Sequence, residues 1–268
     1  MSALTTSAAA GASAATPVPV LSLTDVAKRY VTGAEIVSAL QGVSLDIHVG
    51  QYVAIIGQSG SGKSTLMNIL GCLDTPTSGT YRLAGQDVST LDETRLAQVR
   101  NAEIGFVFQQ FHLLATLSAW RNVELPLVYA GMDRPERKRL AMQALERVGL
   151  GHRVEHRPNE LSGGQQQRVA VARALVTNPA MILADEPTGN LDSASTDDVL
   201  GLFADLHAAG STIVLITHET EVASRASRRV KLSDGLIVSD ESDDDAADLT
   251  HTSLNTLLGL PAQRGSWQ

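Results

Sequence analysis

The stretch that most constrains the fold is a glycine-rich run set between two apolar segments. It follows the apolar residues 52–56, leads into the apolar residues 66–70 and fits the pattern G-x-x-x-x-G-K-[ST]. Its members are Gly57, Gln58, Ser59, Gly60, Ser61, Gly62, Lys63, Ser64 and Thr65. The order of these segments predicts a strand, a turn and a helix, which is the arrangement of a P-loop.

Each residue type in this loop suits contact with a chain of phosphates. Glycines let successive backbone N–H groups approach a phosphate, because no Cβ is in the way and a positive φ costs them little. Lys63 is placed to reach the β- and γ-phosphates, and the Ser64 hydroxyl is placed to bind Mg²⁺. We therefore expect a nucleoside triphosphate site. A flexible surface turn is the alternative, and the strand and helix patterns on either side disfavour it.

Composition narrows the class of protein. The 268 residues are 43% hydrophobic, which is enough for one domain with a substantial core and a smaller subdomain. Acidic residues between 240 and 248 account for most of the formal net charge of −8, and no basic surface is evident, so we expect no nucleic-acid partner. The single cysteine, Cys72, fits a reducing compartment, and no apolar run is long enough to span a membrane.

The two ends of the chain differ from the rest. Residues 1–19 contain no Lys or Arg, so we expect a disordered leader and not a signal peptide. Residues 241–268 combine an acidic run with little apolar content, which predicts a mobile tail with at most one short helix within 249–260. The predicted folded domain is residues 20–240.

Apolar periodicity gives the expected elements of that domain. Residues 21–26 and 43–49 alternate in polarity, with Gly33 at a turn between them, and predict an antiparallel layer. From 111 to about 178 the pattern is helical, which predicts a helical subdomain inserted into a sheet domain. Other expected elements are strands at 80–83, 104–109, 181–184 and 212–216, a helix at 93–100 and a hairpin at 229–240. Because the runs 181–184 and 212–216 are continuously apolar, they indicate buried parallel strands, and the predicted fold class is α/β.

Polar residues at strand ends are the candidates for chemistry. Asp185 and Glu186 follow a buried strand, where two adjacent carboxylates are costly without a cation or solvent. Beside a nucleotide, Asp185 is suited to support Mg²⁺ through its water shell, and Glu186 is suited to accept a proton from the attacking water. Two solvated loop acids are the alternative.

Three other residues are weaker candidates on position alone. Gln109 ends an expected strand, from which a glutamine can reach Mg²⁺ or the attacking water, although a surface glutamine is the default. His218 ends another strand, from which it can donate to a γ-phosphate. Tyr30 is either an aromatic platform for adenine or a partly exposed core tyrosine.

A second anion site is expected where a later helix begins. The run at 161–165 reads Leu-Ser-Gly-Gly-Gln and precedes a helical pattern. Ser162 is a candidate N-cap, and the glycines after it expose N–H groups at the helix N-terminus.

Together these motifs carry a family resemblance. With the P-loop, LSGGQ at 161–165, ILADEP at 182–187, NLD at 190–192 and TH at 217–218 in this order, the chain resembles the ATP-binding subunit of an ABC transporter. LSGGQ is the decisive motif, because kinases, GTPases and RecA-like motors lack it. The segments 67–81 and 111–114 resemble the MacB-like and LolD-like branch.

The resemblance implies a P-loop NTPase core of the RecA-like type that binds ATP and Mg²⁺ and hydrolyses ATP. Tyr30, Gln109 and His218 match the family's adenine-facing aromatic, its Q-loop glutamine and its switch histidine. In the family two copies pair head to tail. The residues that the resemblance places against the partner's nucleotide are Ser162, Gly163, Gly164 and Gln165, and the residue that it implies couples the two sites is Asp192. The implied partner is an integral membrane permease at the cytoplasmic face of the cell membrane, which the subunit drives for export or mechanotransmission.

A soluble ABC ATPase that acts on DNA or ribosomes is the alternative function. Such proteins carry long coiled-coil insertions or two cassettes in tandem, whereas this chain has one cassette and no heptad run. A catalytically inactive binding module is a third option, and the intact Lys63, Asp185, Glu186 and His218 argue against it. Because the ATP-binding subunit does not form the substrate site, this sequence does not specify what is transported.

Overall fold

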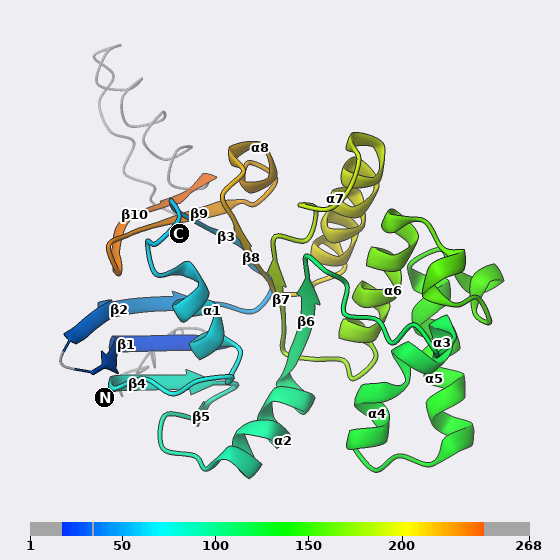
Figure 1. Ribbon diagram of the computed structural model, residues 1–268, viewed down its shortest axis with the longest axis horizontal. Coiled ribbons are helices and arrows are strands. Elements are labelled where there is room, and N and C mark those ends of the chain that lie inside the picture. Colours follow the sequence, from blue (N-terminus) through cyan, green and yellow to red (C-terminus); the bar gives the residue numbers. More distant parts are fainter. Residues whose placement is uncertain (1–17, 34, 244–268) are drawn as a thin grey trace, which may run out of the picture.

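A computed structural model describes residues 18–33 and 35–243 of the chain. Most of the expected leader and most of the expected acidic tail, including the short helix within 249–260, lie outside the described residues. Within the described part, the strands form two sheets, one six-stranded in the order β10-β9-β3-β8-β7-β6 and one four-stranded in the order β2-β1-β4-β5 (Figure 1).

The larger sheet is parallel except at one edge. Its strands are β3 (Tyr52–Ile56), β6 (Ile104–Phe108), β7 (Met181–Asp185), β8 (Ile213–Thr217), β9 (Arg228–Ser233) and β10 (Leu236–Ser242). Only β10 runs antiparallel to its neighbour, β9. This arrangement confirms the predicted α/β class with a mostly parallel sheet, and the β9–β10 hairpin turns across Asp234 and Gly235 as predicted.

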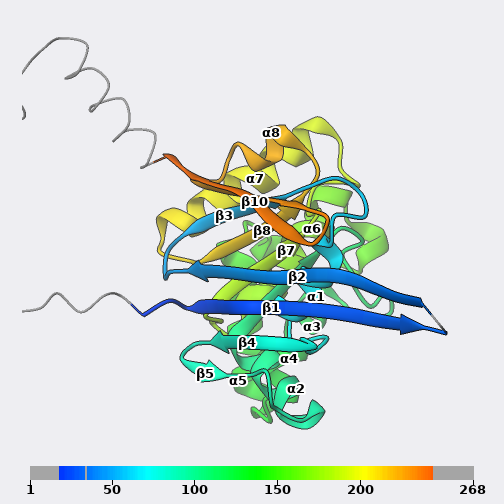
Figure 2. The ribbon, with the colours of Figure 1, turned by 90° about the vertical axis from the view of Figure 1, so that its left-hand side faces the viewer.

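The smaller sheet is antiparallel and confirms the predicted β subdomain. Its strands are β1 (Leu21–Thr32), β2 (Glu35–Ile47), β4 (Ser78–Leu83) and β5 (Gln86–Asp87). The predicted strands at 21–26 and 43–49 differ from the observed ones: β1 continues to Thr32, and β2 begins at Glu35 and ends at Ile47, before residue 49. In β1, shifts in register between Leu23 and Arg29 break the alternation on which the prediction rests. Figure 2 shows β1 and β2 as one long hairpin lying beside β4.

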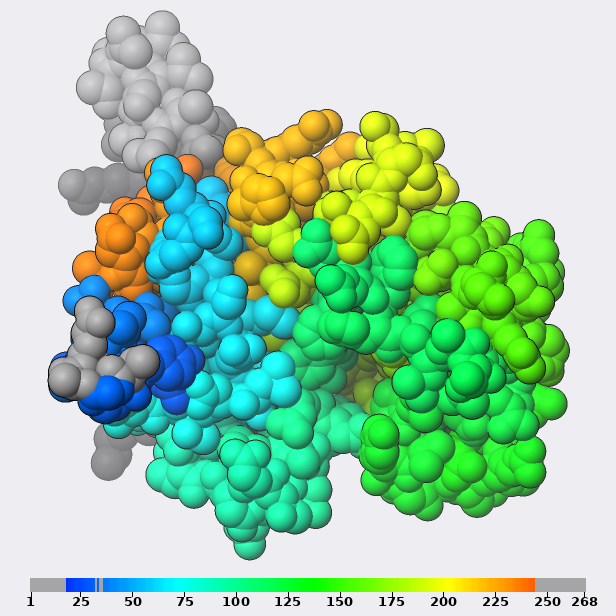
Figure 3. Space-filling model, viewed as in Figure 1, coloured from blue at the N-terminus to red at the C-terminus, as the bar shows by residue number. Residues whose placement is uncertain are grey.

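The helices connect the strands; some pack on the larger sheet and others pack on one another. They are α1 (Lys63–Leu70), α2 (Glu93–Glu103), α3 (Ala119–Val123), α4 (Leu125–Tyr129), α5 (Arg134–Arg147), α6 (Gly163–Leu175), α7 (Ser193–Ala208) and α8 (Thr220–Ala223), with 3₁₀ turns at Gly151–Arg153 and Pro158–Glu160. Helices α3 to α6 lie within the predicted helical range 111–178. They form a lobe, green in Figure 3, beside the blue and cyan part of the molecule.

The central strands face a hydrophobic core on each side. In β3, Tyr52 and Ala54 join the core cluster under α3, α5, α6 and α7, whereas Val53 and Ile55 join the cluster between the sheet, α1 and the antiparallel layer. Successive side chains of a strand point to opposite faces, so a strand buried on both faces must be apolar throughout. The ends of these strands are therefore the places where polar side chains can gather.

Candidate functional site

The glycine-rich loop folds as the turn between β3 and α1. Helix α1 begins at Lys63, and its N-cap residue Gly62 has a φ of 102°. A Cβ at Gly62 would also lie 2.6 Å from the carbonyl oxygen of Ala39 in β2. Only glycine tolerates both the positive φ and this close approach, so the loop geometry depends on the residue type that the motif supplies.

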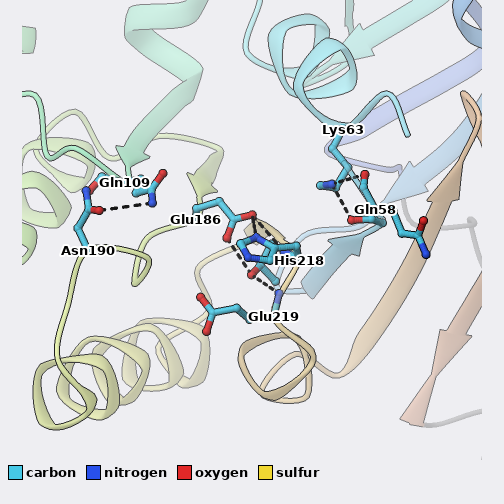
Figure 4. A network of polar contacts seen from close by, with 9 residues as sticks. Gln58, Lys63, Gln109, Glu186, Asn190, His218 and Glu219 are labelled. Carbon is cyan, nitrogen blue, oxygen red and sulfur yellow. Dashed lines mark hydrogen bonds and ion pairs between the residues drawn. The ribbon is translucent and has the colours of Figure 1, made fainter. Parts of the chain in front are cut away.

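The Lys63 side chain folds back over this turn. Its Nζ donates hydrogen bonds to the backbone oxygens of Gly57, at 2.6 Å, and Gln58, at 2.9 Å (Figure 4). The ammonium group is thus held at the loop by neutral carbonyl groups. An anion at the loop would attract the same charge more strongly than these carbonyls do.

A cavity of about 1330 Å³ lies beside the loop. It exceeds the roughly 300–1,000 Å³ of common small-molecule pockets, so a ligand as large as a nucleotide fits inside it. The predicted site residues that line it are Gly57, Gln58, Ser59, Gly60, Gly62, Lys63, Ser64, Thr65, Gln109, Asp185, Glu186 and His218. The structure therefore brings residues from four distant parts of the sequence together at the carboxyl ends of the parallel strands.

Glu186 has the most constrained conformation in this group. Its φ is +43°, a left-handed value that costs free energy for a residue other than glycine and recurs at functional sites. Its carboxylate accepts hydrogen bonds from the Thr217 hydroxyl at 3.2 Å and the His218 backbone N–H at 3.1 Å. One carboxylate oxygen also lies 2.6 Å from His218 Nδ1 (Figure 4). The carboxylate is therefore fixed by the residues that end β8.

Hydrogen bonding, burial and neighbouring charges in the cavity shift the pKa values of His218 and Asp185. The Glu186 carboxylate raises the pKa of His218 above 6.5, first as a hydrogen-bond partner and then as a nearby negative charge. Burial raises the pKa of Asp185, the Glu186 charge adds to the rise, and the Lys63 charge opposes it. A partly buried acid beside a second acid is stabilised in its charged form by a cation.

Gln109 reaches the cavity from the loop after β6. Its side-chain Nε2 lies 3.5 Å from Oδ1 of Asn190, and the Asn190 Nδ2 donates to the Gln109 backbone oxygen at 3.1 Å (Figure 4). Gly189 leaves space for this side chain, because a Cβ there would lie 2.5 Å from the Gln109 Nε2. The loop that follows Glu186 therefore sets the direction of Gln109.

Several predicted residues lie apart from the cavity lining. Ser61 is buried, and a Cβ at Gly57 would lie 2.6 Å from its hydroxyl oxygen, so its side chain packs inside the loop. The Tyr30 hydroxyl donates to Asp74 at 3.1 Å, and the Tyr30 ring does not line the cavity. Stacking of Tyr30 on adenine stays a prediction.

The LSGGQ segment also lies apart from the cavity of its own chain. Ser162 caps α6 as predicted, because its hydroxyl accepts from the Gln165 N–H at 3.3 Å, and the Gln165 side chain accepts from the Ser162 N–H at 3.1 Å. A Cβ at Gly164 would lie 3.0 Å from Ser195, so glycine lets α6 approach α7. Asp192 in turn caps α7 by accepting from the Ser195 N–H at 2.9 Å.

Sequence reasoning missed the residues that two hairpins bring to the cavity. They are Val37, Ser38, Ala39 and Gln41 of β2 and Lys231, Asp234 and Gly235 of the β9–β10 hairpin. No motif marks them, and only the Asp-Gly pair has a recognisable pattern, which predicts a turn.

The chemistry of the cavity fits Mg²⁺ that is held mainly by a nucleotide. Among the described residues, no group of three or more His, Cys, Asp or Glu side chains is able to hold a metal ion. Mg²⁺ typically takes one or two carboxylates and completes its shell with phosphate oxygens and water. Ser64, Gln109 and Asp185 line the same cavity, and their oxygen atoms would suit that smaller set of ligands.

Comparisons with known proteins agree with this geometry. The model of the ABC transporter family matches residues 40–189. The macrolide export ATP-binding/permease protein MacB of Hyphomonas neptunium is 56% identical over 229 residues, which cover 85% of this chain and 36% of that protein. The ABC transporter ATP-binding protein YknY of Bacillus subtilis is 56% identical over 218 residues, which cover 81% of this chain and 95% of that protein.

A solved structure extends the comparison to the fold. The dimeric post-hydrolysis state of the ATP-binding cassette MJ0796, bound to ADP and Pi, aligns with a TM-score of 0.75 and 44% identity over 83% of this chain and 98% of that one. The chain thus spans about a third of MacB and nearly all of YknY and MJ0796. Since the family match covers more than half of the chain, this protein belongs to the ABC transporter family, as an ATP-binding cassette of the ATPase type.

Proposed function

We propose that the chain binds ATP with Mg²⁺, pairs with a second copy of itself and uses ATP hydrolysis to drive a separate membrane permease. The observation that carries this proposal is the convergence of Lys63, Gln109, Asp185, Glu186 and His218 on one cavity. A phosphate-binding lysine, a candidate metal ligand and a candidate base are the groups that hydrolysis of a phosphoanhydride requires.

In the proposed reaction, a water molecule attacks the γ-phosphorus of ATP. The bond from that phosphorus to the bridging oxygen breaks, and Glu186 accepts the proton that the water loses. Lys63 and the N–H groups of the glycine-rich loop hold the β- and γ-phosphates. His218 donates a hydrogen bond to a γ-phosphate oxygen from Nε2, the ring nitrogen that does not contact Glu186. Bound Mg²⁺ would neutralise charge on the phosphate oxygens.

The LSGGQ segment supports the proposal of a pair. Ser162 is exposed and does not line the cavity of its own chain, so this segment is free to face a nucleotide held by another copy. The cassette MJ0796, which aligns with 83% of this chain, is dimeric in its solved structure. A two-fold pair would give two equivalent sites, each with Lys63 from one copy and Ser162 from the other.

A permease is the proposed partner because the relatives point to transport. The relative MacB is named as an ATP-binding and permease protein, and the match covers 36% of its length. Among the described residues, none of the helices is long and apolar enough to cross a membrane. The proposed site of action is the cytoplasmic face of the cell membrane, where a separate permease would hold the chain.

Two substitutions test the assigned roles of Lys63 and Glu186. We expect Lys63→Ala to lose ATP binding, because the ammonium group contacts the phosphates of the ground state. We expect Glu186→Gln to keep ATP binding and to lower turnover by ~10² to 10⁴, the usual contribution of a positioned base. Isothermal titration calorimetry and a phosphate-release assay measure the two quantities. A Glu186→Gln protein with more than about a tenth of wild-type turnover would contradict the role of Glu186 as base.

A further inference from the structure

Three segments that lie far apart in the sequence meet at the back of the glycine-rich loop. They are the loop itself at Ser61 and Gly62, strand β2 at Ala39 to Gln41, and the β9–β10 turn at Asp234 and Gly235. Ser61 does not line the cavity, whereas Gly62, Gln41 and Gly235 do. The contacts among them are therefore next to the proposed phosphate site.

Backbone hydrogen bonds join the three segments in series. The Gly235 N–H donates to the Ser61 carbonyl oxygen at 2.9 Å, and the Gln41 N–H donates to the Gly235 carbonyl oxygen at 2.9 Å. The Gln41 side chain adds a bond from its Nε2 to the Asp234 carbonyl oxygen at 2.8 Å. Each segment is thus tied to the next without any charged side chain.

Close approach of backbone to backbone makes this junction specific for glycine. A Cβ at Gly235 would lie 2.7 Å from the Ala39 carbonyl oxygen, and a Cβ at Gly62 would lie 2.6 Å from the same atom. Both glycines also have positive φ, 75° at Gly235 and 102° at Gly62. The Ala39 carbonyl group therefore marks the point where the three segments are packed most tightly.

The bond to Ser61 bears on phosphate binding through peptide geometry. The peptide group between Ser61 and Gly62 is planar and trans, so its C=O and N–H point in opposite directions. When Gly235 fixes the Ser61 carbonyl, it fixes the direction of the Gly62 N–H as well. That N–H is one of the backbone donors that such a loop offers to phosphate.

We propose that the Asp234–Gly235 turn, with Gln41, acts as a brace that holds the Ser61–Gly62 peptide in its phosphate-binding orientation. Gly235 and Gln41 are therefore positioning residues for nucleotide binding. The inference rests on the proposed function of the cavity as an ATP site, and it adds residues that no motif in the sequence marks. Preorganised donors lose less freedom on binding, so loosening this brace weakens affinity.

The chain offers a matched control turn for the test. Ala84 and Gly85 connect β4 to β5 with φ values of 48° and 81°, close to the 49° and 75° of Asp234 and Gly235. A Cβ at Gly85 meets no atom within 4 Å, so Gly85→Ala carries the conformational cost without the steric one. At Gly235 the added methyl group would point at the Ala39 carbonyl.

The test compares Gly235→Ala and Gly85→Ala in the full chain. We expect Gly235→Ala to raise the Kd for Mg-ADP, measured by calorimetry, about tenfold. A change of this size corresponds to the loss of about one hydrogen bond. We expect its KM for ATP to rise in parallel, with kcat within about twofold of wild type, because the altered contact is a ground-state one. Gly85→Ala should bind Mg-ADP as the wild type does. Equal Kd values for the two variants would contradict the proposal that this turn acts as a brace.

A second variant keeps the proposal testable if Gly235→Ala does not fold. Gln41→Met removes the bond to the Asp234 oxygen and keeps the backbone bond to Gly235, and we expect it to weaken Mg-ADP binding about threefold. Combined with Gly235→Ala, it should add little, because both changes loosen one junction. Unchanged binding in Gln41→Met, or fully additive losses in the double variant, would overturn the brace. Failure of the wild type to bind Mg-ADP would instead contradict the proposed function.

Discussion

At the residue scale, Glu186 and His218 form a short polar contact between two residues that line the cavity. The carboxylate oxygen and His218 Nδ1 are 2.6 Å apart, and the His218 side chain is exposed. A protonated imidazole donates to the carboxylate with the help of its charge, so the contact favours the charged histidine. In the proposed reaction the same carboxylate must instead accept a proton from water. The pair therefore links the protonation of His218 to the availability of Glu186.

This link predicts a pH dependence with a definite sign. Because the pKa of His218 is raised above 6.5 by Glu186, the ion pair is fully formed below pH 6.5 and is lost as the pH rises through the raised value. We expect Glu186→Gln to lower the pKa of His218 towards 6.5, since a neutral amide gives no charge attraction. An NMR titration of the seven histidines measures it, with His218→Ala to assign the signal. A His218 pKa that is unchanged in Glu186→Gln would show that the pair does not form.

At the element scale, Arg173 near the end of α6 connects the helix to the segment after Gln109. Its guanidinium donates to the backbone oxygens of Phe111 at 2.7 Å and His112 at 2.6 Å. These two residues have φ values of +52° and +49°, which are costly for side chains of this size. Burial lowers the pKa of Arg173, which still holds its charge at neutral pH. The helix that starts with LSGGQ is thus tied to the loop that carries Gln109.

Removing the Arg173 hydrogen bonds should lower the free energy of unfolding more than removing a surface ion pair of the same helix. We expect Arg173→Met to lower the free energy of unfolding by about 2–4 kcal/mol, because two charge-assisted hydrogen bonds are lost and two carbonyl groups lose a partner. Arg168 pairs with the exposed Asp198 at 3.0 Å, so Arg168→Met should cost less than about 1 kcal/mol. Urea unfolding of both variants measures the difference. A larger loss of stability in Arg168→Met than in Arg173→Met would contradict the importance of the Arg173 contacts.

At the scale of the whole molecule, the proposed ATP site draws on two copies of the chain. The cavity is lined by the P-loop and the strand ends, while α6 presents Ser162 elsewhere. Two copies of a chain with a formal net charge of −8 repel each other at long range, so pairing needs attractive short-range contacts. Short-range contacts to a shared γ-phosphate would then decide whether two copies pair.

We expect the protein to be mainly monomeric when free or with ADP, and to dimerise when Glu186→Gln is given Mg-ATP. Hydrogen bonds to a charged phosphate contribute roughly 1.5 to 3 kcal/mol each, and ADP lacks the phosphate group that both copies would share. Adding Ser162→Arg should abolish the dimer, because a bulky cation replaces the hydroxyl at the helix start. Sedimentation velocity measures the three states. A dimer that survives Ser162→Arg would exclude the proposed role of the LSGGQ segment.

The sequence by itself determined the motifs and most of the strands that carry them. The P-loop, the apolar runs of β7 and β8 and the acids that follow β7 are local patterns, because backbone geometry and burial act over a few residues. Only the tertiary structure decided which distant segments share the cavity. Gln41 and Gly235 reach it through strand pairing and close backbone contacts, which leave no mark on either segment alone. Such contacts depend on the relative placement of two hairpins, which residue patterns within either hairpin do not encode.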